Sequence, residues 1–367
     1  MNSPQQEPSQ ASQGGVFRKS RGFLSIQLMT LKKLPAVFFC RILPRVRYSK
    51  IVSLGAYRGE RDVYNDELIG PINSSDEWIR RRTGIISRKR ALSGTTVVDM
   101  AYAASKEALN DAQMRPEDID LILVATITHF GHTPSVAAHV GFRIGVQDAI
   151  LLDINAACAG FSYAIFQADL MIKSGVASRA LVIGVDKLSE FIDPLDRTIS
   201  FLLADGAGAA ILVGSTSMGI GKTVCGGNPG QLESVGLTGS TTDVKSGSAW
   251  PTLRQEGSSI FRWAVWQMAK VAKQILDINQ VQPGDLNAFI PHQANIRIID
   301  ELAKQIGLEE NVLIAQDICK TGNTSSASIP LAMHSLIKGN PSLSGELALQ
   351  IGFGAGLVYA GQTVVMP

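Results

Sequence analysis

The chain is poor in cysteine, in histidine and in long apolar runs. Its 367 residues include four cysteines and five histidines, and no two cysteines have a CxxC spacing. We therefore expect no disulfide framework and no metal site, and a reducing cytoplasm is the simplest location. The longest apolar stretch near the N-terminus, residues 34–40, contains a proline and is too short to cross a bilayer. We expect no membrane partner.

Acidic residues are missing from most of the N-terminal region. None lies between Glu7 and Glu60, and residues 1–50 hold nine Lys or Arg residues. We interpret residues 1–49 as a disordered or non-native extension, although a targeting peptide has a similar bias and Met29 is an available internal start. Residues 51–367 hold 25 basic and 31 acidic residues. This balance argues against nucleic acid as a partner, and any phosphate or carrier-protein site must be a local basic patch.

The remaining chain has the pattern of a duplicated α/β protein. It is 45% hydrophobic in composition and longer than one core usually requires. Residues 115–122 and 282–289 repeat the same order of helix end, Pro-x-Asp turn and apolar strand. The apolar run 120–126 is typical of a strand covered on both faces, and residues 149–153 read as another buried strand. We predict two halves, residues 50–220 and 221–367, with alternating strands and helices.

Cys158 is the first candidate for chemistry. It lies in the segment INAACAGF, residues 154–161, between the strand at 149–153 and a helix expected over 161–174. The partial positive charge of a helix N-terminus favours thiolate over thiol, and the small neighbours leave room for a substrate carbonyl. The alternative is a structural core cysteine, because free cysteines are commonly buried.

Two distant segments strengthen the catalytic reading of Cys158. His292 lies in PHQANIR, after an apolar strand at 288–290 and before a helix at 296–306, and Asn323 lies in TGNTSSAS before another helix. A strand-end His is often structural and an Asn before Thr or Ser is often a helix cap. One Cys, one His and one Asn, each beside a helix start, together form a candidate for nucleophilic catalysis.

These three segments carry a family resemblance. ACAGF, PHQANIRI and GNTSSAS resemble the three signatures of β-ketoacyl-ACP synthase III, a condensing enzyme of the thiolase superfamily, and weaker matches extend the resemblance over about residues 51–367. The resemblance implies a thiolase-like, duplicated αβαβα five-layer fold, and a homodimer. It also implies an acyltransferase that initiates type II fatty acid synthesis without a cofactor, using acyl-CoA and malonyl-ACP as substrates.

The resemblance assigns roles to the three residues. Cys158 would accept the acyl group from coenzyme A, and backbone N–H groups of Cys158 and Ala355 would bind the oxyanion. Malonyl-ACP would then lose carbon dioxide, and its enolate would attack the acyl-cysteine. His292 and Asn323 would donate hydrogen bonds to the developing negative charge, and a secondary role of His292 in assisting Cys158 stays open. An asparagine there is informative, because it can donate but cannot titrate.

The resemblance also implies residues that contact coenzyme A, pantetheine or the carrier: Trp78, Arg82, Arg197, Phe261, Gln293, Ala294, Asn295 and Arg297. Trp78 would stack on adenine and the arginines would pair with phosphates or the acidic carrier. Ser258 stands where the family often has Asn. Thr133 aligns with an acyl-pocket residue that is Phe in short-primer synthases, which predicts primers longer than acetyl.

Three other functions stay open on the sequence. The first is a related acyl-cysteine condensing enzyme or acyltransferase of secondary, polyketide-type metabolism. The second is a hydrolase that uses Cys, His and Asn. The third is a non-catalytic acyl-binding protein with a thiolase-like body.

Overall fold

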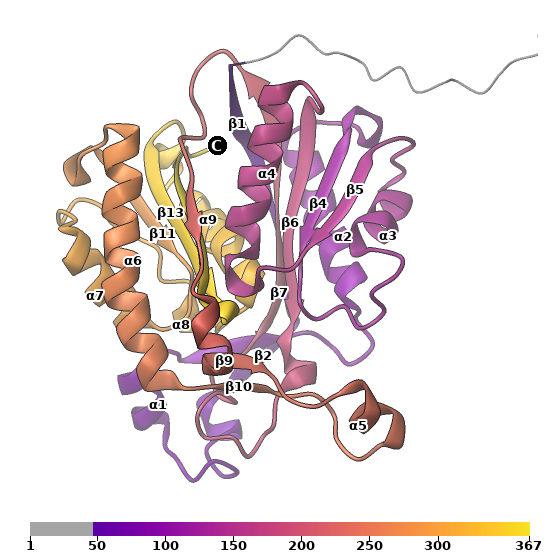
Figure 1. Cartoon of the computed structure of the whole chain (residues 1–367), viewed down its shortest axis with the longest axis vertical. Coiled ribbons are helices and arrows are strands. Elements are labelled where there is room, and N and C mark those ends of the chain that lie inside the picture. The colour runs from indigo at the N-terminus through magenta and orange to yellow at the C-terminus, as the bar shows by residue number, and fades with distance from the viewer. Residues whose placement is uncertain (1–46) are drawn as a thin grey trace, which may run out of the picture. The chain divides into compact units, whose positions relative to one another are not determined.

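The computed structural model describes residues 47–367 and contains two five-stranded sheets (Figure 1). The prediction of an N-terminal extension over residues 1–49 thus lies almost wholly outside the described residues, and Tyr48 already opens β1. The first sheet has the order β1-β7-β6-β4-β5, with β1 (Tyr48–Arg58), β4 (Leu121–Ala125), β5 (Ile150–Ile154), β6 (Arg179–Lys187) and β7 (Asp205–Ser215). The second has the order β12-β11-β13-β14-β8, with β8 (Val224–Gly226), β11 (Ala288–Pro291), β12 (Leu313–Ile314), β13 (Leu347–Gly354) and β14 (Val358–Val365).

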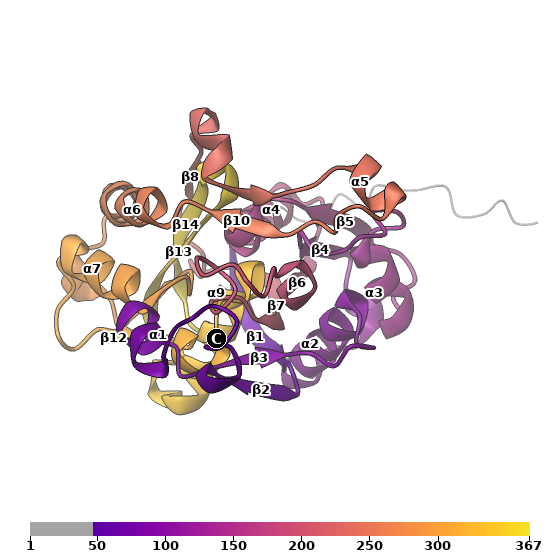
Figure 2. The same cartoon turned by 90° about the horizontal axis from the view of Figure 1, so that it is seen from below.

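Helices form three layers around the two sheets. The central layer holds α4 (Gly160–Ser174) and α9 (Ser328–Gly339), which share one hydrophobic cluster with both sheets. The outer face of the first sheet packs on α2 (Val97–Asp111) and α3 (Val136–Ile144). The outer face of the second packs on α6 (Gly257–Asn279) and α7 (Ile296–Ile306) (Figures 1 and 2). The five-layer prediction is confirmed.

The duplication is visible in the strand order. Read from one edge, β1-β7-β6-β4-β5 of the first sheet corresponds to β8-β14-β13-β11-β12 of the second. The repeated Pro-x-Asp segments both form 3-10 turns, Pro116–Asp118 before β4 and Pro283–Asp285 before β11. The first sheet uses residues 48–215 and the second uses 224–365, so each sheet comes from one stretch of chain.

Local sequence signals place the first helices. Ser75 caps α1 (Asp76–Thr83) by accepting a hydrogen bond from the Trp78 N–H, and Thr96 caps α2 in the same way. Strand β4 is buried at all five positions, as predicted from its apolar run. Among the described residues, no helix is long and apolar enough to cross a membrane.

Strand β5 corrects one expectation. It was expected to be buried, but it lies at the edge of the first sheet, and the side chains of Leu151 and Leu152 are 37% and 42% exposed. An apolar run is typical of a covered strand. It does not show whether the covering comes from the same chain.

Shorter elements gather at one end of the sheets, and some of them line the site. They include α1, the antiparallel pair β2 (Arg61–Tyr64) and β3 (Ser87–Arg90), β9 (Val235–Leu237), α5 (Thr241–Ser246), β10 (Leu253–Gln255) and α8 (Ile318–Thr321) (Figure 1). A separate hydrophobic cluster joins α1, β10, α7 and α8 through Ile79, Leu253, Ile299 and Ile318. This cluster fixes α1 and β10 against the two-sheet body.

Candidate active site

Cys158, His292 and Asn323 line one inner cavity of about 80 Å³. Cys158 follows β5 in a 3-10 turn that leads into α4, and His292 follows β11. Asn323 lies between α8 and a second 3-10 turn that leads into α9. The structure therefore brings together the three residues that the sequence singled out, one from the first half and two from the second.

Burial is the main cause of the raised pKa of the Cys158 thiol. Desolvation raises the pKa of Cys158 to about 12, and the Ser325 hydroxyl lowers it only in part, while the negative charge of Asp186 raises it further. The expectation that the start of α4 would favour thiolate is opposed by this burial, which favours the thiol. The physical reason is that removing water from around the sulfur disfavours its charged form.

His292 is held as a neutral imidazole. Its Nδ1 lies 2.7 Å from the Ser328 Oγ, and its ring packs edge-on against Phe353 with centroids 5.3 Å apart. Burial alone lowers the pKa of His292 to about 3. At neutral pH the ring is therefore uncharged, and Nε2 is the nitrogen left for a substrate.

Asn323 is oriented by its own backbone and by the next turn. Its backbone N–H donates to the Leu202 carbonyl at 2.8 Å, and its carbonyl accepts from the Ala204 N–H at 2.9 Å. Its side-chain Oδ1 accepts the Ser325 N–H at 2.9 Å. Because the amide oxygen is engaged, the NH₂ group is the part of the side chain that remains free to donate.

Strained backbone surrounds the inner cavity. Ala157, Ser325 and Leu357 all line it, and all have positive φ angles, of 46°, 52° and 44°. Such conformations cost of order 1–3 kcal/mol each in non-glycine residues and tend to cluster at functional sites. Each one lies within two residues of Cys158, Asn323 or Ala355, so the strain falls on the turns that hold the reactive groups.

The glycine-rich turn after β13 touches the nucleophile. A Cβ built on Gly354 would lie 2.7 Å from the backbone nitrogen of Cys158, so only glycine allows this approach. The turn brings Ala355 into the lining of the inner cavity. An oxyanion site made of the Cys158 and Ala355 N–H groups fits this arrangement and stays a prediction.

Two residues lie elsewhere than expected. Gln293 is buried and lines neither the inner cavity nor the outer cleft. Its amide NH₂ donates to the carbonyls of Pro291 and Ala315, and its oxygen accepts the Ile318 N–H. Its hydrogen-bonding capacity is used to brace the His292 loop against α8, so a direct substrate contact is not supported. Thr133 is exposed in the loop between β4 and α3 and lines neither cavity of this chain.

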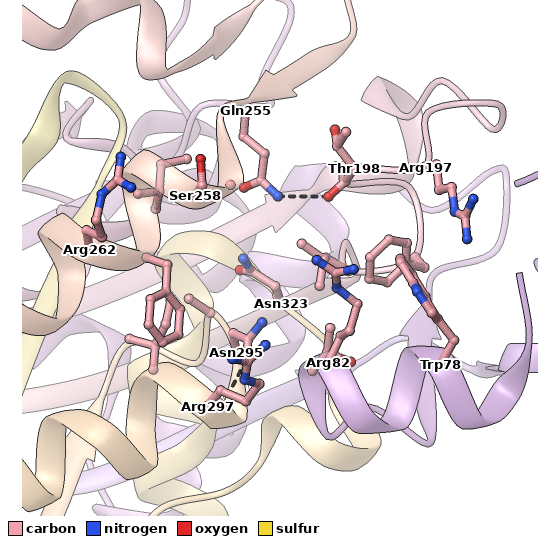
Figure 3. A pocket seen from close by; sticks show the side chains of 18 residues that line it. Trp78, Arg82, Arg197, Thr198, Gln255, Ser258, Arg262, Asn295, Arg297 and Asn323 are labelled. Atoms are coloured by element: carbon pink, nitrogen blue, oxygen red, sulfur yellow. Dashed lines mark hydrogen bonds between the residues drawn. The ribbon is translucent and has the colours of Figure 1, made fainter.

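An outer cleft of about 850 Å³ leads to the inner cavity. The two share Gln255, Ile260, Ala294 and Asn323 in their walls. Figure 3 shows Asn323 at the back of the cleft, with Trp78 and Arg197 on one side and Arg262 on the other. The cleft brings together most of the expected substrate contacts, namely Trp78, Arg82, Arg197, Phe261, Ala294, Asn295 and Arg297, with Ser258 beside them.

Positive charge gathers at this cleft without neutralising partners. Among the described residues, no carboxylate lies within ion-pair distance of Arg82, Arg197, Arg262 or Arg297. The Cζ atoms of Arg82 and Arg197 lie 4.8 and 4.9 Å from the centroid of the Trp78 ring. Arg262 was missed in the sequence, because a single Arg in a helix carries no signal of its own.

Comparisons with known proteins agree with this geometry. The sequence profile of 3-oxoacyl-[acyl-carrier-protein (ACP)] synthase III matches residues 152–229, and that of its C-terminal region matches residues 276–366. Two curated proteins named beta-ketoacyl-[acyl-carrier-protein] synthase III, from Kocuria rhizophila and Streptomyces glaucescens, are each 45% identical over 87% of this chain and 97% of their own length. The chain belongs to the β-ketoacyl-[acyl-carrier-protein] synthase III family.

Solved structures place it in the same group. The priming β-ketosynthase of the R1128 polyketide pathway is 40% identical and has a TM-score of 0.86, covering 91% of this chain and 99% of its own. The 3-oxoacyl-[acyl-carrier-protein] synthase III of Aquifex aeolicus is 37% identical with a TM-score of 0.80, covering 86% and 99%. The family and the thiolase-like fold expected for a synthase III are confirmed.

Proposed function

We propose that the protein is an acyltransferase that condenses an acyl-CoA primer with malonyl-ACP and so initiates fatty acid synthesis. One observation carries this proposal: His292, Asn323 and Cys158 line the same small cavity, with the Oδ1 of Asn323 engaged by the Ser325 N–H and the Nδ1 of His292 beside the Ser328 hydroxyl, so that the Asn323 NH₂ group and the His292 Nε2 are left for a substrate. Two fixed neutral donors suit an enolate oxygen, which forms as carbon dioxide leaves, without a general base.

The first stage is transfer of the acyl group to sulfur. The Cys158 sulfur attacks the thioester carbonyl of acyl-CoA, the bond to the coenzyme A sulfur breaks, and the thiol proton ends on coenzyme A. Thioester exchange keeps the acyl group activated. The oxyanion of this step would face the Cys158 and Ala355 N–H groups, beside the close contact at Gly354.

The second stage forms the carbon–carbon bond. The malonyl carboxylate leaves as carbon dioxide, and the resulting enolate attacks the acyl carbonyl on Cys158. The bond to the Cys158 sulfur breaks, and the thiolate takes a proton from solvent. His292 and Asn323 hold the enolate oxygen, and removing one such donor would cost roughly 3–4 kcal/mol of barrier.

The outer cleft fits the pantetheine-linked substrates. Trp78 carries the Arg82 and Arg197 guanidinium groups over its ring, and Phe261 carries that of Arg297, so an adenine that stacked on Trp78 would have to displace an arginine. These three arginines have no carboxylate partner among residues 47–367, and they offer guanidinium groups for phosphates or for an acidic carrier protein. Asn323 closes the inner end of this cleft. A thioester arm inserted through the cleft would thus reach the cavity that holds Cys158.

The inner cavity favours a short primer. Its walls include Ile127, Leu188, Val235 and Leu253, and its volume of about 80 Å³ is roughly half that of an engineered 150 Å³ cavity that accepts benzene. The prediction of primers longer than acetyl rested on Thr133, which lies outside this cavity in a single chain. Activity across a series of acyl-CoA primers should fall when the acyl chain is longer than a few carbons. Leu253→Ala should extend the range of accepted chain lengths. Thr133→Phe should leave that range unchanged if Thr133 does not line the acyl pocket.

A homodimer is part of the proposal. Strand β5 presents an open edge with exposed Leu151 and Leu152, and the neighbouring helix α3 exposes 86% of Phe142. An uncovered apolar edge strand is a template for pairing with a second copy. Sedimentation should give twice the chain mass, and Leu151→Lys should shift the measured mass toward that of the monomer.

The cytoplasmic location stays a prediction.

One experiment separates the candidate functions. The protein is mixed with acyl-CoA and analysed by mass spectrometry, and malonyl-ACP is then added while carbon dioxide and 3-oxoacyl-ACP are measured. We expect an acyl adduct on Cys158, absent in Cys158→Ala, followed by carbon dioxide release and product. Free fatty acid without chain growth would support the hydrolase, and no adduct would support the acyl-binding protein. An adduct without use of malonyl-ACP would contradict the condensation.

A further inference from the structure

Ser328 and His292 form a buried pair whose serine has no role in the chemistry above. Ser328 is the first residue of α9 and is 1% exposed, while His292 is 2% exposed. The Ser328 Oγ lies 2.7 Å from Nδ1 of His292, and the backbone N–H of Gln293 donates to the same oxygen at 3.3 Å. The hydrogen bond at Nδ1 decides whether the other ring nitrogen, Nε2, carries a hydrogen.

A count of hydrogens decides the direction of this bond. A serine hydroxyl has one hydrogen, and its oxygen already accepts the Gln293 N–H. Among residues 47–367, the only acceptor within hydrogen-bond distance of the Ser328 hydroxyl is Nδ1 of His292. If Nδ1 donated instead, the hydroxyl hydrogen would be buried without a partner, which is unfavourable. The hydroxyl therefore donates to Nδ1, and the ring hydrogen lies on Nε2.

The first half of the molecule provides an internal comparison. Counted from the repeated 3-10 turns, Ala125 at the end of β4 is equivalent to His292, which directly follows β11. Gly160 is the first residue of α4, just as Ser328 is the first residue of α9. A Cβ on Gly160 would lie 2.8 Å from the Ala125 Cβ, so these equivalent positions also touch. The duplicated frame therefore forms with two small residues at this contact and does not itself need the imidazole–hydroxyl pair.

We infer that Ser328 is a positioning residue that locks His292 in the Nε2–H form, so that His292 donates to the enolate and never accepts the Cys158 proton. This inference rests on the proposed condensation. His292 keeps its one proton through both stages. The thiol proton ends on coenzyme A in the first stage, and the thiolate released in the second takes a proton from solvent.

The two stages respond differently to loss of the hydroxyl. In Ser328→Ala, Nδ1 has no fixed partner, and part of the population carries the hydrogen on Nδ1. We expect condensation by pre-acylated enzyme to fall about 10–100-fold, while the burst of coenzyme A released on acylation stays within about threefold. Ser328→Thr, which keeps a hydroxyl, should restore condensation to within about fivefold of wild type.

A matched control tests whether loss of any buried serine has this effect. Ser105 is also fully buried, lies in α2, and donates to the Ala101 carbonyl within its own helix. Ser105→Ala should leave both stages within about twofold. Equal loss of acylation and condensation in folded Ser328→Ala would overturn the inference, and so would unchanged condensation.

A spectroscopic measurement needs no variant. Nitrogen NMR of histidine-labelled wild type should show His292 with a protonated Nε2 and an unprotonated, hydrogen-bonded Nδ1. A protonated Nδ1 in wild type would overturn the inference even if Ser328→Ala failed to fold. If wild type formed the acyl adduct and made no 3-oxoacyl-ACP, the proposed function would fail, while the NMR result would still decide the state of His292.

Discussion

The inner cavity and the outer cleft share four lining residues and are built in opposite ways. The inner cavity is small and mostly apolar, and three of its lining residues have strained backbone. The outer cleft has about ten times the volume and exposes four arginines that have no carboxylate partner within residues 47–367. Rigid turns hold the groups that react, whereas long, solvated side chains meet the part of the substrate that only has to be recognised.

This contrast predicts where substitutions act. Changes in the inner cavity alter the geometry of bond formation, so they should lower kcat. Changes in the outer cleft alter binding shared by the ground state and the transition state, so they should raise KM. Variants of Gly354, Asn323 and the outer arginines test this division.

The largest expected effect comes from Gly354→Ala. The added Cβ would lie 2.7 Å from the Cys158 nitrogen, so the turn or the nucleophile must move. Because a misplacement of about 1 Å can cost 10²-fold and a lost oxyanion donor 10²–10³-fold, we expect kcat to fall about 10³-fold. Steady-state kinetics on folded protein, verified by circular dichroism, measures this.

Gly257 of the outer cleft provides the matched control. A Cβ on Gly257 meets nothing within 4 Å, so Gly257→Ala should leave kcat within about twofold. If the two glycine variants lost kcat equally, the contrast between the two cavities would be wrong.

Asn323→Ala should have the next largest effect. Its NH₂ group is the donor left free by the Ser325 N–H bond to Oδ1. We expect carbon dioxide release from malonyl-ACP to fall about 10²-fold, with acylation of Cys158 nearly unchanged. Asn323→Asp should fall further, because a carboxylate has no donor and repels the enolate. Faster decarboxylation by Asn323→Asp than by Asn323→Ala would contradict the donor role.

The sequence predicted the reactive groups better than their environment. Cys158, His292 and Asn323 could be found because each stands in a short segment with a family signature, and the repeated Pro-x-Asp turn revealed the duplicated fold. The pKa of the Cys158 thiol could not be found in this way. It depends on how much water the folded site excludes, and that is a property of many distant residues.

Other features of the site depend on contacts that form only in the folded chain. Gln293 stands inside a signature segment, yet its amide is used by three backbone groups that only folding brings near. The exposure of β5 depends on strand order and on whether a second copy pairs with it. The positive φ angles of Ala157 and Ser325 left no trace, because neither residue type is typical of that conformation.

The outer arginines should have a moderate effect that depends on salt. Arg82→Ala and Arg197→Ala each remove an exposed guanidinium with no carboxylate partner among the described residues. We expect KM for acyl-CoA to rise about 5–10-fold at low salt with kcat unchanged, and the difference from wild type to shrink at high salt. Both kinetic constants measured across a salt series test this. A lower kcat at constant KM would place these arginines with the chemistry instead.

The smallest expected effect concerns Asp186, a fully buried carboxylate behind the inner cavity. Its oxygens accept hydrogen bonds from the Ile127 N–H at 2.9 Å, from the Thr128 hydroxyl at 3.0 Å, and from the Ser326 N–H and hydroxyl at 3.1 and 2.7 Å. Burial raises the pKa of Asp186, and these donors oppose that rise. With so many donors on its two oxygens, we expect the group to be ionised.

Asp186→Asn would remove a charge that raises the pKa of Cys158. The thiolate fraction grows as pH approaches the thiol pKa, so a lower pKa shifts the pH profile of Cys158 alkylation to lower pH and speeds alkylation at pH 8. Ser326→Ala keeps the charge and removes a hydroxyl that lies within hydrogen-bond distance of both the Asp186 carboxylate and the Ala125 carbonyl, so its profile should stay near that of wild type. Equal profiles for Asp186→Asn and wild type would mean that the Asp186 carboxyl is neutral in the folded protein. Equal shifts in the two variants would instead trace the change to loosened packing around the Ser325 turn.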